Sequence, residues 1–197
     1  MIIYIRTMRT KDEFKQEALF KATVKLVNEI GFVSSSVAKI AKEAGISPAT
    51  IYIYYKNKED LLVCTYVNIK RNLSKAMLEN FHSSLPIRDI LRNAWFNMFR
   101  HITKYPDYFQ FTEQFANSPY SALVNSLDVD KYFEPIINVL QRGIEQKIIK
   151  PVDFDILFAF AFYPIITLAN PRLCDNFEVN EKNIETAFTM AWDAIKL

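Results

Sequence analysis

Apolar residues near the start of the chain recur at steps of three and four, which is the spacing of one helical face. The stripe consists of Ala18, Leu19, Ala22, Leu26 and Ile30. Gly31 follows it and is expected to end the helix, because glycine readily adopts the left-handed conformation found at helix C-termini. The pattern therefore predicts a first helix that ends near residue 30 and buries one face.

Two short helices are predicted next, with a turn at Gly45 between them. Ser35 or Ser36 can cap the first, because a hydroxyl oxygen accepts a hydrogen bond from a free N–H of the first turn. The buried face of this helix would comprise Val37, Ile40, Ala41 and Ala44. The second opens at Ser47-Pro48, where serine caps the helix and proline at the first helical position loses no needed donor.

A longer helix is expected over about residues 58–80, with Asn57 as its cap and two acidic residues in its first turn. The supporting helix and the two short helices together have the arrangement of a DNA-binding helix-turn-helix. A plain helical hairpin in an all-α core has the same spacing, so the pattern by itself leaves both interpretations open.

Prolines divide the rest of the chain into segments of helical length, because the residue before a proline disfavours the α conformation. The segments lie near 87–104, 107–118, 121–147, 153–169 and 180–196. Pro164 falls inside an apolar segment and is expected to kink its helix, whereas Pro135 would fit a helical first turn. With no convincing alternating strand, the predicted fold class is all-α with about nine helices. An N-terminal three-helix unit, residues 1–57, would be joined to a C-terminal helical domain, residues 58–197.

The amino-acid composition disfavours several classes of protein. Three glycines among 197 residues argue against glycine-rich phosphate loops and turn-dense β folds. The net charge of +2 includes a mildly basic first part, since residues 1–60 carry ten Lys or Arg and seven acidic residues.

Isolated thiols at Cys64 and Cys174, without metal-ligand spacing, suggest a reducing compartment and no metal site. No signal peptide is evident, and the apolar run over residues 156–169 is too short for a membrane span. We expect a soluble cytoplasmic protein without a cofactor.

Residues 18–62 resemble the N-terminal domain of TetR-family transcriptional repressors. The matching pattern is Gly31-Phe32-x-x-Ser35-Ser36-Val37-x-x-Ile40-Ala41-x-x-Ala44-Gly45-Ile46-Ser47, then Thr50-Ile51-Tyr52-x-Tyr54-Tyr55-x-x-Lys58-Glu59-x-Leu61. It is long and ungapped. A weaker likeness follows in Gly143…Ile148…Pro151-x-Asp153 before an apolar helix. The resemblance implies DNA binding, and it implies that residues 47–54 form the recognition helix.

The residues expected to contact double-stranded DNA are Ser36, Lys39, Ser47, Pro48, Ala49, Thr50, Tyr52, Ile53, Tyr54 and Lys58. The resemblance gives phosphate contacts to Ser36, Tyr54 and Lys58. Hydroxyls suit base edges or phosphates, and Ala49 or Ile53 would suit a thymine methyl group.

Pro48 departs from the family, which often has a long polar side chain there, and no Arg, Asn or Gln lies between residues 47 and 55. DNA shape and an N-terminal arm with Arg6, Arg9 and Lys11 could then contribute to specificity. A frayed terminus is the alternative for that arm, and a solvated helix face is the alternative for Lys39.

Reading a two-fold operator requires a dimer, and the resemblance assigns dimerisation to the helices near 153–169 and 180–196. It also implies a small-molecule effector in the C-terminal domain, here of apolar or aromatic character. The candidate contacts are Trp95, Phe96, Phe99, His101, Phe111, Phe115 and Phe162. A packed aromatic core is the alternative reading of these side chains.

Two other functions are the alternatives to DNA-dependent repression. An enzyme is disfavoured because the chain lacks a glycine-rich nucleotide loop and the common hydrolase and metalloprotease motifs. A dimeric helical adaptor that has lost specific DNA binding is the second, motivated by the few base-reading donors around Pro48. The preferred prediction is a ligand-responsive repressor that binds a palindromic operator as a dimer.

Overall fold

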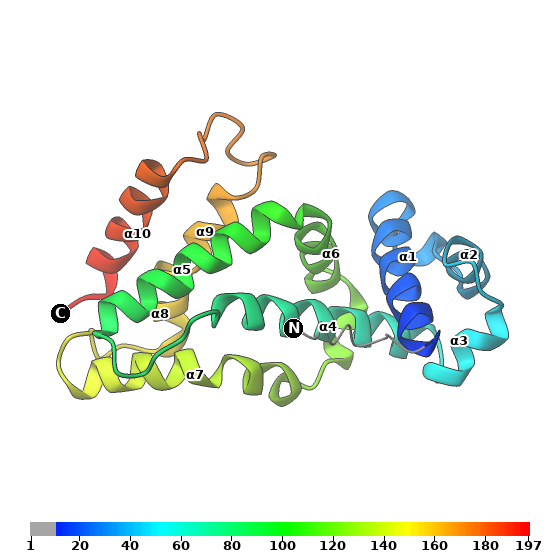
Figure 1. Cartoon of the computed structure of the whole chain (residues 1–197), viewed down its shortest axis with the longest axis horizontal. Coiled ribbons are helices and arrows are strands. Elements are labelled where there is room, and N and C mark those ends of the chain that lie inside the picture. Colours follow the sequence, from blue (N-terminus) through cyan, green and yellow to red (C-terminus); the bar gives the residue numbers. More distant parts are fainter. Residues whose placement is uncertain (1–10) are drawn as a thin grey trace, which may run out of the picture. The chain divides into compact units, whose positions relative to one another are not determined.

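The computed structural model describes residues 11–197, which form ten α-helices and one short 3-10 helix (Figure 1). The α-helices are α1 (Lys11–Ser34), α2 (Val37–Glu43), α3 (Pro48–Tyr54), α4 (Lys58–Met77), α5 (Ile87–Lys104), α6 (Pro106–Ala116), α7 (Ser126–Glu145), α8 (Phe154–Ala161), α9 (Tyr163–Leu168) and α10 (Glu181–Ile195), with the 3-10 helix η1 at Pro119–Leu123. One isolated bridge, between Ile149 and Lys196, is the sole β pairing among these residues. The all-α prediction is confirmed.

The helices group into two compact units. The first contains the described residues up to Tyr66 together with residues 110–124, and the second contains residues 67–109 and 125–197. These units differ from the predicted division at residue 57, because α4 and α6 each contribute residues to both.

The core of the first unit is apolar and draws on all four N-terminal helices. Its buried members are Leu19, Ala22, Ile40, Ala41, Ile51 and Leu61. Gly31 interrupts α1 with φ of 76°, and Gly45 turns the chain between α2 and α3 with φ of 68°. Side chains rarely adopt positive φ, so both glycines are required where the sequence pattern predicted helix ends.

The end of α6 and the helix η1 complete the first unit through aromatic contacts. The Phe32 ring lies 5.7 Å from that of Phe111, 6.0 Å from Phe115 and 5.4 Å from Tyr120, between centroids. Tyr66 of α4 stacks on Phe115 at 4.4 Å. The chain after Gly31 is therefore packed by residues about 80 positions further along.

The second unit packs α5 against α7, α9 and α10 around a large aromatic core. Trp95 is 1% exposed, and its indole Nε1–H donates a hydrogen bond of 2.7 Å to the Ala161 carbonyl oxygen. That carbonyl lies at the end of α8, where the chain breaks at Phe162 before α9 begins with Pro164 in its first turn. The predicted kink at Pro164 is confirmed as a helix break. Pro135, in contrast, lies within α7 rather than in its first turn.

Among the described helices, none combines the length and apolarity needed to cross a lipid bilayer.

Candidate nucleic-acid interface

Side-chain caps hold the two short helices in place. The Ser36 hydroxyl accepts from the Lys39 backbone N–H at 3.3 Å, and the Ser47 hydroxyl accepts from the Thr50 N–H at 3.2 Å. Each cap satisfies a donor that the first helical turn would leave unpaired. Of the two predicted caps for α2, Ser36 is the one used. Ser35 instead is buried and donates to the Gly31 carbonyl oxygen.

Helix α3 has one buried and one exposed face. Ile51 is fully buried in the core of the first unit, whereas Tyr52 is 57% and Ile53 is 75% exposed. The remaining exposed positions of this segment are Ser47, Pro48 and Ala49. The hydroxyl groups of Ser47 and Thr50 lie 2.9 Å apart and hydrogen-bond to each other. The predicted recognition helix thus presents an outer face of two large side chains and a small, mostly apolar N-terminal end.

Two lysines bind backbone carbonyls in the last turn of α1, just before α2 begins. Lys58 Nζ donates to the carbonyl oxygen of Phe32 at 2.5 Å, and Lys39 Nζ donates to that of Ser34 at 3.1 Å. An ammonium group has three donors, so each lysine keeps N–H groups for a further acceptor. The structure thereby places Lys58, a predicted phosphate contact, and Lys39, a predicted DNA contact, at the end of α1, close in sequence to the Ser36 cap of α2.

Tyr54, at the end of α3, points to the start of α1. Its hydroxyl donates a hydrogen bond of 3.0 Å to Asp12 Oδ1. Partial desolvation, followed by the bond to Asp12, raises the pKa of Tyr54. No sequence pattern indicated this pair, because the two residues are 42 positions apart and Asp12 belongs to no recognised motif.

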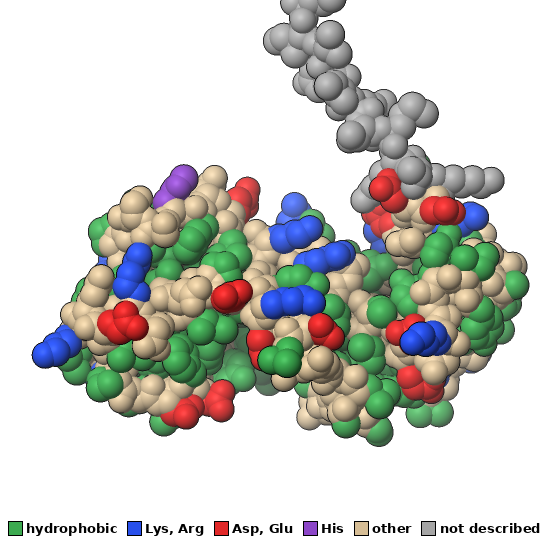
Figure 2. Space-filling view, turned by 90° about the horizontal axis from the view of Figure 1, so that it is seen from below, with side chains coloured by type: hydrophobic (Ala, Val, Ile, Leu, Met, Phe, Trp, Pro, Cys, Tyr) green, Lys and Arg blue, Asp and Glu red, His purple; other side chains and the backbone are tan. Residues whose placement is uncertain are grey.

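The predicted N-terminal arm lies mostly outside the described residues. Arg6 and Arg9 are not described, and Lys11 is described only as the first backbone position of α1. On the face shown in Figure 2, Lys and Arg side chains alternate with Asp and Glu rather than forming one broad basic patch. This agrees with the small net charge of +2.

The predicted effector contacts are distributed over both units. Phe111 and Phe115 belong to the first unit, and the other five belong to the second. All six predicted aromatic contacts are 7% exposed or less. A hollow lined by Trp95, Phe162, Phe188 and Trp192 has a volume of about 10 Å³, the size of one water molecule. In this conformation these aromatics pack as core.

His101 is the polar member of the predicted effector set. Burial, with a smaller contribution from nearby Lys104, lowers its pKa. Its buried Nε2 has no hydrogen-bond partner among the described residues, while its ring lies 4.9 Å from that of Tyr105.

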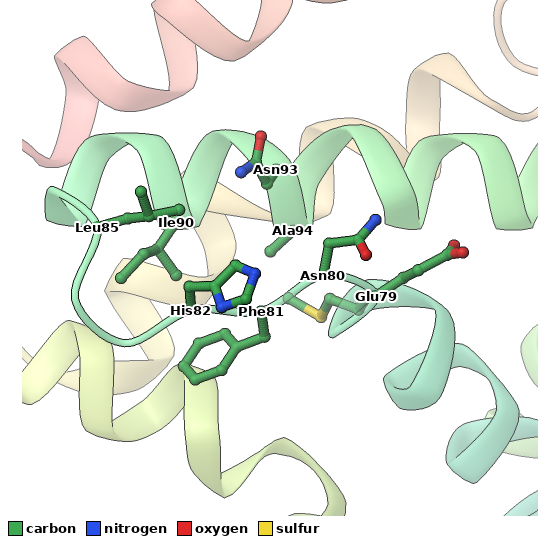
Figure 3. A pocket seen from close by; sticks show the side chains of 9 residues that line it. Glu79, Asn80, Phe81, His82, Leu85, Ile90, Asn93 and Ala94 are labelled. Carbon is green, nitrogen blue, oxygen red and sulfur yellow. The ribbon is translucent and has the colours of Figure 1, made fainter.

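A polar groove that the sequence did not reveal opens over α5. It has a volume of about 240 Å³, and its lining includes Arg92, Asn97 and Arg100. Glu79, Asn80 and Asn93 line both this groove and a smaller adjoining hollow, in which His82 lies between Phe81 and Ile90 (Figure 3). The turn after α4 builds one wall, and this turn has no distinctive sequence pattern.

One surface of the second unit is strongly apolar. On α8 and α9, Leu157, Ala161 and Phe162 are buried, while Ile156, Phe160 and Tyr163 are 49%, 57% and 59% exposed. Ile156 and Phe160 are four residues apart and so share one side of α8, and Tyr163 follows at the first position of α9. Neighbouring α10, which packs on α8, buries its stripe Ile184, Phe188, Ala191, Trp192 and Ile195 and leaves Met190 exposed.

Comparison with known proteins identifies both parts of the chain. Residues 19–63 match the family described as bacterial regulatory proteins, tetR family, and residues 86–196 match the tetracyclin repressor-like C-terminal domain. The crystal structure of a TetR family transcription regulator from Marinobacter aquaeolei VT8 is 37% identical, with a TM-score of 0.86 over 96% of this chain and 99% of that one.

Relatives from other bacteria also bear the names of regulatory proteins. An HTH-type transcriptional regulator of Haemophilus influenzae is 26% identical over 91% of this chain and 95% of its own length. The fatty acid metabolism regulator protein of Bacillus subtilis is 44% identical, but only over 52 residues, or 26% of this chain and 27% of that protein. The chain therefore belongs to the TetR family and is a helix-turn-helix transcriptional regulator rather than an enzyme.

Proposed function

We propose that this protein is a repressor that binds a palindromic operator as a homodimer and is released by a small effector. The observation that carries the proposal is the outward face of α3, fixed by the buried Ile51 and by the caps at Ser36 and Ser47. A helix held in this way enters the major groove with its exposed side chains toward base edges.

The DNA contacts divide by chemistry. Ala49, Tyr52 and Ile53 would face the bases, where the apolar side chains suit thymine methyl groups and the Tyr52 hydroxyl can donate or accept. Ser36, Lys39, Thr50, Tyr54 and Lys58 would hold phosphates, which position the protein without reading sequence. Ser47 and Pro48 would lie where the N-terminal end of α3 enters the major groove. With no Arg, Asn or Gln in this segment, DNA shape would contribute much of the specificity.

The homodimer would form through α8, α9 and α10. Ile156, Phe160 and Tyr163 present an apolar face that this chain leaves uncovered in its second unit. Burying such a face against its own copy is favourable, because removal of apolar surface from water drives association. Pairing two copies would supply the two recognition helices that successive half-sites need.

An apolar or aromatic effector would act on the second unit. The hollow lined by Leu91, Trp95, Phe162 and Trp192 would have to open to admit it, so the effector would select a less populated conformation. The only two tryptophans of the chain, Trp95 and Trp192, both line this hollow. Their fluorescence should therefore change on titration with decanol or toluene. An Ala191→Leu variant, which fills the hollow, should lose the response, and an unchanged spectrum in the wild type would argue against an apolar effector.

The test of DNA binding is selection of bound fragments from genomic DNA by the purified protein. We expect enrichment of a palindromic site with half-sites about one helical turn apart. Lys58→Ala should weaken binding to every sequence about equally and reduce its salt dependence, because a phosphate contact carries no sequence information. No enrichment above random DNA at low salt would instead favour the dimeric adaptor.

A further inference from the structure

The contact between Tyr54 and Asp12 joins the end of the recognition helix to the first turn of α1. The hydroxyl–carboxylate distance is 3.0 Å, and the Asp12 side chain is 69% exposed. Lys15 is a charged neighbour of the same carboxylate, with its Nζ 3.9 Å from Asp12 Oδ1. The carboxylate is therefore held at the surface, beside a tyrosine that DNA-binding by α3 would bring close to a phosphate.

We propose that Asp12 sets the DNA affinity of this protein by competing with a DNA phosphate for the Tyr54 hydroxyl. This inference rests on the proposed function, in which α3 binds DNA. A phenol hydroxyl carries one hydrogen, so it can donate to the carboxylate or to a phosphate, but not fully to both. Free protein satisfies the hydroxyl internally, and DNA binding must exchange one anionic acceptor for another.

Asp12 has two separable effects on DNA binding. The first is the competition for the proton, which requires the Tyr54 hydroxyl and depends weakly on salt. The second is repulsion between the carboxylate and the phosphates, which does not require Tyr54 and is screened by salt. Any neighbouring carboxylate produces the second effect, whereas only Asp12 can produce the first.

The two lysines expected at phosphates do not compete with a carboxylate in this way. Lys39 and Lys58 donate to backbone carbonyls, which are neutral, and each retains further N–H donors. Tyr54 has no donor to spare. The DNA-binding surface thus contains one contact that is available only when Asp12 releases it.

The experiment measures affinity for a random-sequence 30-base-pair duplex by fluorescence anisotropy, because a phosphate contact does not depend on sequence. The proteins are wild type, Asp12→Ala, Tyr54→Phe and the double variant. The control is Glu13→Ala, which removes the same charge from the adjacent, exposed position. Circular dichroism confirms that each variant is folded.

We expect Asp12→Ala to bind the duplex about threefold more tightly than Glu13→Ala, because only Asp12 also competes for the Tyr54 hydroxyl. A factor of about this size is typical of a single exposed polar pair. In the Tyr54→Phe background the two alanine substitutions should have equal effects. Equal effects in the wild-type background as well would overturn the competition and leave only charge. Failure of every protein to bind the duplex at low salt would instead reject the proposed function, and with it the role of Asp12.

Discussion

His101 is a half-buried imidazole whose protonation should affect folding stability. Burial lowers its pKa in the folded protein below the ordinary value of 6.5, and its Nε2 has no partner among the described residues. The unfolded chain therefore binds the proton at a higher pH than the folded chain does. The free energy of unfolding should therefore fall as the pH decreases below 6.5. It should become constant again below the pKa that His101 has in the folded protein.

This prediction is checked by urea unfolding at pH 7.5 and pH 5.5, compared between wild type and His101→Phe. The wild type should lose more stability on acidification than the variant, because the variant has no imidazole to protonate. Parallel losses in the two proteins would show that His101 does not contribute to the pH dependence.

Helix α7 ends in close contact with the strand-like segment that follows it. A Cβ atom added at Gly143 would lie 2.5 Å from Cδ1 and 2.8 Å from Cγ1 of Ile149, which is fully buried and bridges to Lys196. Only glycine lets the segment approach the helix this closely. The glycine that the sequence pattern singled out as part of a weak family likeness thus has a packing role.

Gly143→Ala should lower the free energy of unfolding by about 1–3 kcal/mol, the usual cost of overpacking a core. In an Ile149→Val background the added cost should be smaller, because valine lacks the Cδ1 atom that would be closest. Urea denaturation of the four proteins measures this coupling. Gln141→Ala, at an exposed position of the same helix, serves as the control and should change stability by less than about 0.5 kcal/mol. Strictly additive losses would contradict the clash.

The oligomeric state of the whole molecule should depend on the exposed apolar face of α8 and α9. Phe160→Glu places a charge in that face and should convert the proposed homodimer into a monomer, because a buried unpaired charge is costly. Light scattering should then give the chain mass of 23.0 kDa instead of twice that value.

Operator affinity should fall in the same variant, since a monomer reads only one half-site. The control is Leu127→Glu, which makes the same change at an apolar position of α7 that is 72% exposed. A wild-type protein that is monomeric at micromolar concentration would refute this arrangement. So would a Leu127→Glu variant that dissociates as readily as Phe160→Glu.

Local sequence determined the elements of this protein. The positions of Gly31, Gly45, Ser47 and Pro48 fixed where helices end and begin, and the structure has its boundaries within a few residues of those predicted. This succeeded because caps, prolines and positive-φ glycines act on their own neighbours in the chain. The ungapped family pattern then predicted the helix-turn-helix and its outward helix.

Only the tertiary structure decided which helical faces are covered and which groups meet. The apolar helix near residues 153–169 has two hydrophobic faces, and packing on α10 and α5 buries one of them and exposes Phe160. The aromatic side chains that suggested an effector pocket fill their own core, and Tyr54 finds Asp12 across 42 residues. Such outcomes depend on long-range packing between residues far apart in the chain, which hydrophobic spacing does not encode.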